Sequence, residues 1–314
     1  MGIIYKKLDV AQLTKDNTVF VTITRFAKLF NLPKDKTFIV PSGEMVKSLY
    51  YAKKLCNFLI KKNITRQGAI VAIGGGTVGD LSGFVASVYL RGIDLILVPT
   101  TLLAQIDSSI GGKTAINYKG IKNIIGSFYP AKQIIVDFSL LHTLNNKELI
   151  NGYGELVKYT LLNQEIDQLY KYDEYFNAPL IQKCIEYKDL IVSSDYYDHS
   201  LRRNLSLGHT IGHAIEKCYN IPHGRAVLYG LYYELMISSY LGYLNSTDLA
   251  WARKRILDIS PIPKLHNIKN LVSLMQYDKK NNFDSINFVL FIGNFSTKEI
   301  SLSYEEVTKI LQCL

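Results

Sequence analysis

The sequence predicts an α/β protein with an N-terminal parallel-sheet domain and a C-terminal, mainly α-helical domain. Short apolar, β-branched runs alternate with helical patterns up to about residue 150, and helical periodicity dominates after it. The length of 314 residues corresponds to two domains at roughly 150 residues per domain. We therefore expect one domain at residues 1–150 and another at 151–314.

The first half contains four strand candidates. They are residues 38–41, 69–73, 93–98 and 134–136, and residues 49–62 between the first two show a helical pattern. Apolar runs that alternate with helices are typical of a parallel sheet that is covered on both faces. The sequence therefore predicts a parallel sheet here.

The second half contains four helix candidates. They are residues 153–162, 180–193, 211–218 and 226–243, and residues 285–292 are expected to form an isolated strand. The longest apolar stretch, residues 226–244, is interrupted by Glu234, which favours a buried helix over a membrane span.

Composition excludes several classes of protein. Apolar residues make up 48% of the chain, which is enough for a buried core, and the net charge is +9. Because Lys and Arg are scattered without a block of like charges, we expect phosphates or carboxylates as ligands rather than nucleic acid. The four cysteines form no CxxC and the N-terminus has no signal-peptide pattern, so we expect a cytoplasmic protein without a membrane anchor.

A glycine turn follows the apolar run at 69–73. Gly74, Gly76 and Gly79 fit G-x-G-x-x-G and lead into an apolar helix pattern. Glycines let backbone N–H groups approach a diphosphate, and the N-terminus of the following helix favours its negative charge. The context of strand, turn and helix therefore favours nucleotide binding over a purely structural turn.

A polar run follows the apolar run at 93–98. It extends from Pro99 to Asn117 and contains Asp107, Gly111-Gly112 and Lys113, and Lys122-Asn123 comes shortly after. Ligands bind at the carboxyl ends of strands in open α/β sheets, where Lys113 could reach an anion. A solvated loop with an incidental Asp and Lys explains the run equally well.

Three of the six histidines fall within fifteen residues of the second half. His209 and His213 are four apart and share a helical face, and His223 follows. Upstream, Glu155 and Lys158 are three apart on another helix pattern. Catalytic zinc sites use three nitrogen or oxygen ligands, which favours a metal site over a structural histidine pair. The absence of H-E-x-x-H excludes a zincin protease.

A spacing of 4, 3 and 4 links Arg202, Ser206, His209 and His213. If this segment is helical throughout, all four side chains face one way. An arginine on that face would suit a phosphate or a carboxylate.

Together these motifs resemble 3-dehydroquinate synthase, within the sugar phosphate cyclase superfamily. The matching segments occur in family order: Ser42–Ser48, Gly74–Asp80, Tyr89–Gly92, Pro99–Asn117, Lys122–Gly126, Gly154–Lys158, Gly208–Glu216, His223-Gly224 and Asp278–Lys280. The resemblance implies an N-terminal NAD-binding α/β domain, a C-terminal α-helical metal domain with the active site between them, and a homodimer. It also implies the conversion of 3-deoxy-D-arabino-heptulosonate 7-phosphate, a phosphorylated sugar acid, into 3-dehydroquinate and phosphate in the shikimate pathway.

The resemblance also implies roles for individual residues. Glu155, His209 and His223 would hold zinc or cobalt, and His213 would be a catalytic group near the substrate. Substrate or phosphate would be bound by Asp107, Lys113, Asn123, Lys158, Lys188, Arg202 and Lys279, with Lys122 in the same segment and Arg91 near the phosphate, across a dimer. NAD would be bound by Glu44, Lys47, Gly75, Gly76, Asp80, Thr100 and Thr101.

Some positions depart from the family pattern. Ser206 replaces the usual Asn, Arg225 replaces Glu, and Tyr196 and Ser200 replace Glu and Gly before Arg202. These departures leave a sister cyclase with another sugar phosphate as an alternative. A metal-dependent oxidoreductase of the glycerol dehydrogenase type is a second alternative, although a neutral polyol needs no set of lysines. A scaffold without activity is a third, which the complete set of metal-ligand candidates disfavours.

Overall fold

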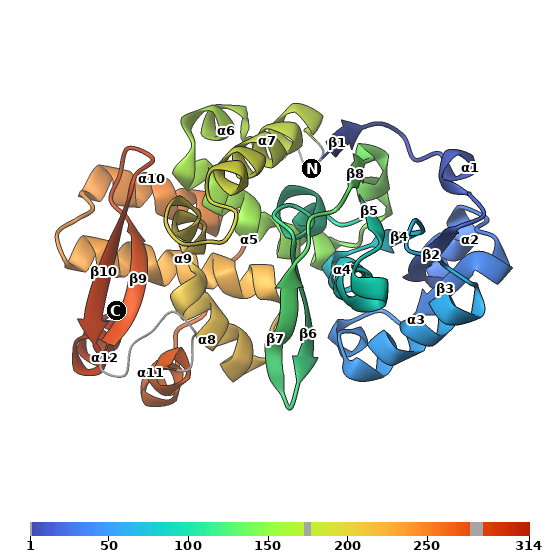
Figure 1. Cartoon of the computed structure of the whole chain (residues 1–314). Helices are drawn as coiled ribbons and strands as arrows, with labels where there is room; N and C mark the ends of the chain where they lie inside the picture. Colours follow the sequence, from blue (N-terminus) through green and yellow to red (C-terminus); the bar gives the residue numbers. More distant parts are fainter. Residues whose placement is uncertain (1, 173–176, 277–284) are drawn as a thin grey trace. The chain divides into compact units, whose positions relative to one another are not determined.

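A computed structural model describes residues 2–172, 177–276 and 285–314 of the chain (Figure 1). The chain divides into two compact units, Met1–Leu144 and Asn145–Leu314, and each is described by itself. The boundary expected at residue 150 falls inside α5 (Asn146–Leu162), the first helix of the second unit. Lys279, expected to bind substrate, lies outside the described residues.

The first unit is built on the parallel sheet that the sequence predicts. Its strand order is β1-β8-β5-β4-β2-β3, and all its neighbours pair in parallel. The strands are β1 (Gly2–Tyr5), β2 (Thr18–Ile23), β3 (Thr37–Val40), β4 (Ala69–Gly74), β5 (Asp94–Pro99) and β8 (Gln133–Val136). The four expected strands are confirmed, and β1 and β2 are additions.

Helices of the first unit join these strands. They are α1 (Val10–Leu13), α2 (Thr24–Leu29), α3 (Leu49–Lys61) and α4 (Gly76–Val88). The expected helix at 49–62 is confirmed as α3, whose first turn is capped by the Ser48 hydroxyl. Helix α4 contacts β4 and β5, so its N-terminus lies at the carboxyl end of β4.

The polar run after β5 is not a simple solvated loop, which was one of the two interpretations of its sequence. A short helical turn, Ala104–Ser108, is followed by an antiparallel hairpin of β6 (Lys113–Tyr118) and β7 (Ile121–Phe128) (Figure 1). Strand β6 packs on α4. The sequence did not predict this hairpin. Most of β7 is exposed on both faces, so it lacks the apolar alternation of a half-buried strand.

The second unit is mainly helical, as expected. Its helices are α5, α6 (Gln164–Leu169), α7 (Ala178–Ser194), α8 (His209–Tyr219), α9 (His223–Tyr240), α10 (Ser246–Leu257), α11 (Ile268–Gln276) and α12 (Tyr304–Cys313). Apolar side chains of α8, α9, α11 and α12 pack in one core. Within the described ranges, no helix is long and apolar enough to cross a membrane.

The prediction of an isolated strand at 285–292 is wrong. Strand β9 (Ser285–Phe291) pairs along its whole length with antiparallel β10 (Thr297–Ser303), and α12 follows (Figure 1). The partner strand escaped notice because its sequence, TKEISLS, is largely polar and only Leu302 in it is buried. A one-sided strand with few apolar residues gives a weak periodic signal.

Candidate active site

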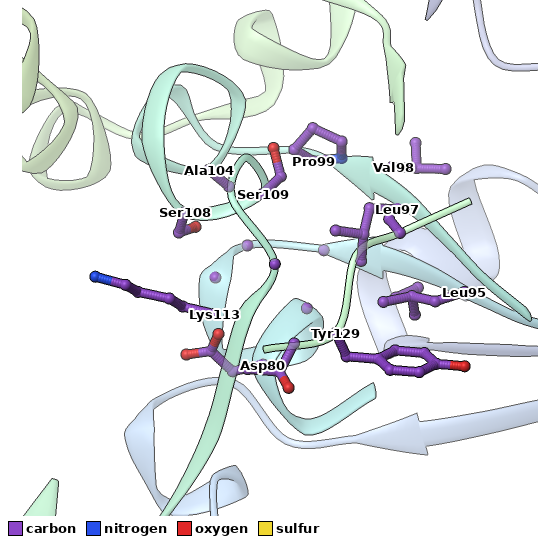
Figure 2. Close-up of a pocket in the computed structure, with 18 residues that line it drawn as sticks. Asp80, Leu95, Leu97, Val98, Pro99, Ala104, Ser108, Ser109, Lys113 and Tyr129 are labelled. Atoms are coloured by element: carbon purple, nitrogen blue, oxygen red, sulfur yellow. The ribbon is translucent and has the colours of Figure 1, made fainter. Parts of the chain in front are cut away.

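The glycine turn between β4 and α4 lines a pocket in the first unit. Figure 2 shows Asp80, Ser108 and Lys113 among the side chains around it. A Cβ atom on Gly76 would lie 2.9 Å from Ser108 Oγ, and one on Gly75 would lie 3.1 Å from Thr101 Cγ2. Glycine therefore suits both positions, and no side chain of the described residues caps the first turn of the 13-residue helix, which suits a diphosphate.

Lys47 connects three segments of this unit. Its ammonium lies 2.6 Å from Asp80 Oδ2 on α4, donates a hydrogen bond to Asn123 Oδ1 on β7, and lies 3.5 Å from Glu44 Oε1. Burial would lower the pKa of Lys47, but Asp80 and Glu44 raise it above its ordinary value. The structure thus joins the expected NAD residues Glu44, Lys47 and Asp80 to Asn123, an expected substrate residue.

Asn117 on β6 completes this network. Its Nδ2 donates to Glu44 Oε1 over 2.9 Å, its Oδ1 accepts from the Asn123 N–H over 2.9 Å, and its own N–H donates to the Lys47 carbonyl over 2.8 Å. In the sequence, Asn117 stood out only as the last residue of the polar run that begins at Pro99. Its contacts with Glu44 and Lys47 could not be predicted, because they join segments that are about 70 residues apart in the sequence.

The other expected residues of this unit lie on several separate segments. Asp107 lies in the Ala104–Ser108 turn, and Thr100 is buried directly after β5. Lys113 begins β6 and Lys122 lies on β7, both exposed. Arg91 is exposed in a turn after α4, with a backbone φ of 64°.

Glu155, His209 and His223 meet in the second unit. Glu155 Oε1 lies 3.2 Å from Nε2 of His209 and 3.5 Å from Nε2 of His223. Glu155 is fully buried, and neither of its carboxylate oxygens accepts a well-aligned hydrogen bond from the described residues. The Lys158 ammonium makes an ion pair with the other oxygen.

Acceptors around the two rings fix which nitrogen carries the proton. Nδ1 of His209 lies 3.1 Å from the Leu207 carbonyl oxygen, and Nδ1 of His223 lies 2.8 Å from Glu216 Oε2. Because both partners are acceptors, both Nδ1 atoms donate. In neutral rings both Nε2 lone pairs would then face the Glu155 carboxylate, an arrangement that needs a cation. A divalent metal fits this donor set, and such outer partners of metal-bound histidines are typical.

The pKa values of these three side chains are shifted by burial and by one another. Burial would raise the pKa of Glu155, but Lys158 and His209 hold it well below its usual range. Burial lowers the pKa of His209 to about 4 despite Glu155. Burial also opposes protonation of His223, but the nearby Glu155 and Glu216 carboxylates raise its pKa to about 10. One positive charge between the rings is therefore favoured.

His213 adjoins this cluster. Ligand atoms of His209, His213 and His223 all lie within 4.8 Å of one another, and the His209 and His213 ring centroids are 5.3 Å apart. Geometry thus allows two ligand sets that share His209 and His223, with either Glu155 or His213 as the third member. The contacts of Glu155 with both other rings favour the set that contains Glu155.

Two glycines bring the helices of this cluster together. A Cβ on Gly154 would lie 1.8 Å from the Gly224 carbonyl oxygen, and one on Gly224 would lie 1.6 Å from the Asn151 carbonyl oxygen. Asn151 Oδ1 also accepts a hydrogen bond of 2.7 Å from the Gly224 N–H. Helices α5 and α9 therefore touch backbone to backbone directly beside Glu155 and His223.

Three expected anion-binding cations of this unit are buried. Lys158, Lys188 and Arg202 have 1%, 5% and 5% of their surface exposed. Lys188 lies on α7, which contacts the turn Leu201–Ser206 that carries Arg202. Burying cations is costly, so such a set is typical of a site for an anionic ligand.

The prediction of one helical stripe from Arg202 to His213 is wrong. Residues Leu201–Ser206 form a 3-10 turn, Gly208 has a φ of 81°, and α8 begins only at His209. His209 and His213 share a face of α8, but Arg202 and Ser206 lie before the break. The stripe depended on a segment that is helical throughout, and the left-handed Gly208 breaks that continuity.

Four further residues of the site in the second unit lie outside the expected set: Glu216, Asn151, Asp195 and Glu234. Glu216 could have been found, because it follows His209 by seven residues on the same helix. Glu234 gave a signal as the single charge in an apolar helix. Asn151 and Asp195 look like ordinary surface polar residues in the sequence.

The fold is that of the sugar phosphate cyclases. A 2-deoxy-scyllo-inosose synthase structure, with carbaglucose-6-phosphate, NAD+ and Co2+, matches with a TM-score of 0.85 and 24% identity over 98% of this chain and 95% of that one. A 2-epi-5-epi-valiolone synthase from Streptomyces hygroscopicus, with NAD+ and Zn2+, matches with a TM-score of 0.87 and 19% identity over 99% and 95%. A probable glycerol dehydrogenase from Sinorhizobium meliloti matches with a TM-score of 0.60 and 13% identity over 99% and 96%.

Sequence comparison identifies the family within this class. The models of the 3-dehydroquinate synthase N-terminal and C-terminal domains match residues 37–151 and 152–281. A 3-dehydroquinate synthase from Alkaliphilus metalliredigens is 39% identical over 87% of this chain and 81% of that protein, and one from Clostridium tetani is 36% identical over 96% and 84%. The chain belongs to the 3-dehydroquinate synthase family.

Proposed function

We propose that this chain converts 3-deoxy-D-arabino-heptulosonate 7-phosphate into 3-dehydroquinate and phosphate, as a carbon–oxygen lyase with NAD and one divalent metal ion. The observation that carries the proposal is the set of buried cations Lys158, Lys188 and Arg202 in the unit that also holds Glu155 and the histidines. A phosphorylated sugar acid brings two anionic groups that such cations can bind, whereas a neutral polyol brings none.

The roles of the residues follow from their chemistry. Glu155, His209 and His223 would hold zinc or cobalt, since each offers one oxygen or nitrogen to a common point. The N–H groups of Gly75 and Gly76, with Thr100 and Thr101, would receive the NAD diphosphate, and Glu44, Lys47 and Asp80 its ribose and adenosine. When bound, NAD would accept a hydride from the carbon that bears one substrate hydroxyl and return it later, and the metal ion would stabilise negative charge on that hydroxyl oxygen.

The chain's own residues orient the substrate and move its protons. Lys158, Lys188 and Arg202 would bind its carboxylate and phosphate, with Asp107, Lys113, Lys122, Asn123, Arg91 and Lys279 supplying further polar contacts. His213, beside the metal ligands, is a proton-transfer group at the neighbouring hydroxyl. Oxidation of that hydroxyl acidifies the adjacent C–H, so the phosphate can leave without a strong base.

Two other functions remain as alternatives. A sister cyclase would release phosphate from another sugar phosphate, and the replacement of Asn by Ser206 is the observation that favours it. An oxidoreductase of the glycerol dehydrogenase type would use the same fold, but the buried cations argue against it. We further propose a homodimer that acts in the cytoplasm on a small molecule and not on nucleic acid.

The test is incubation of the purified chain with the heptulosonate phosphate, NAD and zinc. Inorganic phosphate and 3-dehydroquinate should form in equal amounts. Phosphate release only from a different sugar phosphate would identify a sister cyclase. Absence of phosphate release with any sugar phosphate would reject both cyclase functions.

A further inference from the structure

The segment between α7 and α8 carries two proposed site residues, Arg202 and His209. It is not one helix, because the 3-10 turn Leu201–Ser206 ends before Leu207 and Gly208 adopts a left-handed conformation. A broken segment has no continuous ladder of backbone hydrogen bonds to fix Arg202 relative to His209. Other groups must satisfy its free N–H donors and hold it in place.

Asp195 supplies the first of these groups. Its Oδ1 accepts from the His199 N–H over 2.9 Å, and its Oδ2 accepts from the N–H groups of Ser200 over 2.7 Å and of Arg202 over 3.1 Å. These backbone donors, led by His199 and Ser200, lower the pKa of Asp195 to about 2.

Arg202 is tied to the same loop through its side chain. Its Nη1 donates a hydrogen bond of 2.7 Å to the Tyr196 carbonyl oxygen, which directly follows Asp195. The backbone N–H of Arg202 and its guanidinium are thus both held within residues 195–202. Asp195 thus accepts three hydrogen bonds from the same short loop that binds the guanidinium.

Glu234 supplies the second group, from the middle of α9. Its side chain is fully buried, its Oε2 accepts from the Gly208 N–H over 2.6 Å, and its Oε1 accepts from the Ile211 N–H over 3.1 Å. These donors lie on either side of His209, the first residue of α8. The carboxylate also lies at the positive end of the α8 dipole, which stabilises its charge.

We propose that Asp195 and Glu234 are positioning residues: Asp195 holds Arg202 for the anionic substrate, and Glu234 holds His209 for the metal. The proposal rests on the proposed function for the roles of Arg202 and His209. Each carboxylate acts through backbone N–H groups rather than on metal or substrate. The two effects are therefore separable, one on metal binding and the other on substrate binding.

The Glu234 arm is tested by binding of Co2+ alone to the metal-free full chain. Glu234→Gln keeps the shape but can accept with only one atom, so we expect Co2+ affinity to fall about 10-fold or more, as for lost outer partners of metal ligands. The visible absorption of bound Co2+ should also change. Glu186→Gln removes an exposed carboxylate that contacts Gln182 and is the matched control.

The Asp195 arm is tested by kinetics and by amide hydrogen exchange. Asp195→Asn should raise KM for the heptulosonate phosphate several-fold with kcat nearly unchanged, and leave Co2+ affinity as in the control. Amides of residues 199, 200 and 202 should exchange faster in this variant. Amides of residues 208 and 211 should exchange faster in Glu234→Gln only.

Specific results would overturn each arm. Unchanged Co2+ affinity and absorption in both Glu234→Gln and the shorter Glu234→Asp, which guards against misfolding of the first, would remove the role of Glu234. Unchanged exchange at residues 199–202 in Asp195→Asn would remove the role of Asp195. If the wild type binds Co2+ but does not convert the heptulosonate phosphate, the proposed function fails, while Co2+ binding and amide exchange still decide the two positioning roles.

Discussion

At the scale of single residues, the site depends on the orientation of two imidazole rings. The Leu207 carbonyl and the Glu216 carboxylate accept hydrogen bonds from the Nδ1–H groups of His209 and His223, so both Nε2 atoms are left to face Glu155. A carboxylate and two lone pairs at one point favour a bound cation. The third ligand distinguishes the two possible sets.

Substitution of the proposed ligands tests this arrangement. Glu155→Gln, His209→Ala and His223→Ala should each lose bound zinc, because each removes one of three donors. His213→Ala should keep the zinc and lose rate by about 10²–10⁴-fold, the usual contribution of a general acid or base. Metal content of the purified variants is the measurement. Loss of zinc in His213→Ala with zinc retained in Glu155→Gln would instead assign the three histidines as the ligands.

The lowered pKa of Asp195 predicts that the stability of the fold depends on pH at acidic pH. Its pKa in the folded chain is about 2, below the ordinary 3.8, so its carboxylate stabilises the fold above about pH 4. That contribution is lost as the pH falls from about 4 to about 2, because the proton then binds both states. The difference in unfolding free energy between wild type and Asp195→Asn, measured by denaturant titration, should be constant above pH 4 and shrink below it. A difference that stays constant down to the lowest measurable pH would contradict this assignment.

At the scale of elements, close contacts between segments position the residues of the proposed metal site and of the proposed NAD site. Helices α5 and α9 meet through Gly154 and Gly224, which places Glu155 and His223 next to each other in space. In the first unit, Asn117 ties the β6–β7 hairpin to Glu44. Both contacts join segments that are distant in the sequence.

Gly224→Ala should weaken the second unit. Its Cβ would lie 1.6 Å from the Asn151 carbonyl oxygen, so α5 and α9 must separate. Overpacking of this kind costs about 1–3 kcal/mol, and we expect the metal affinity to fall as well. Unfolding free energy and zinc affinity are the measurements. Gly79→Ala, whose Cβ would meet only Leu97 at 3.8 Å, is the control, and equal effects of both variants on stability would refute the close contact.

Asn117→Ala should weaken NAD binding. The variant loses the hydrogen bonds to Glu44 and from the Asn123 N–H, and a lost hydrogen bond costs about 0.5–1.5 kcal/mol, so NAD affinity should fall about 3- to 10-fold. Titration with NAD measures it. Ser127→Ala, on β7 of the same hairpin, removes a 2.8 Å hydrogen bond to Ser87 on α4 and should leave NAD affinity unchanged. A larger loss in Ser127→Ala would mean that the hairpin acts only through its overall stability.

Predictability from the sequence followed the strength of the apolar pattern. Strands β4 and β5 and helices α3 and α9 are continuous buried or amphipathic runs, and the sequence predicts them closely. Strands β7 and β10 are largely exposed and polar, so periodicity does not distinguish them from loops. The break at Gly208 was missed, because the Glu234 carboxylate that accepts a hydrogen bond from its N–H lies 26 residues away in the sequence.

The residues of the candidate site were also only partly predictable from the sequence. Histidine spacing and the family motifs named Glu155, His209 and His223, and the structure brings these three together. The motifs also named Lys47 and Asn123 without indicating that they touch each other. Partners that act through main-chain groups, such as Asp195, carry no spacing rule and appear only in the fold.

At the scale of the whole molecule, the two units carry different parts of the proposed reaction. The first unit holds the glycine turn and the Lys47 network, and the second holds the ring cluster and the buried cations. The net charge of +9 favours attraction of a doubly anionic substrate. A reaction that oxidises and then reduces one substrate leaves no net change in NAD, which separates it from every dehydrogenase that shares the fold.

The decisive measurement is turnover with less NAD than substrate. The purified, zinc-loaded chain is mixed with excess heptulosonate phosphate and a small amount of NAD, and phosphate and NADH are followed together. We expect many phosphates released per NAD, without accumulation of NADH. Accumulation of one NADH per substrate converted, ending when NAD is consumed, would contradict the proposed synthase and identify a dehydrogenase.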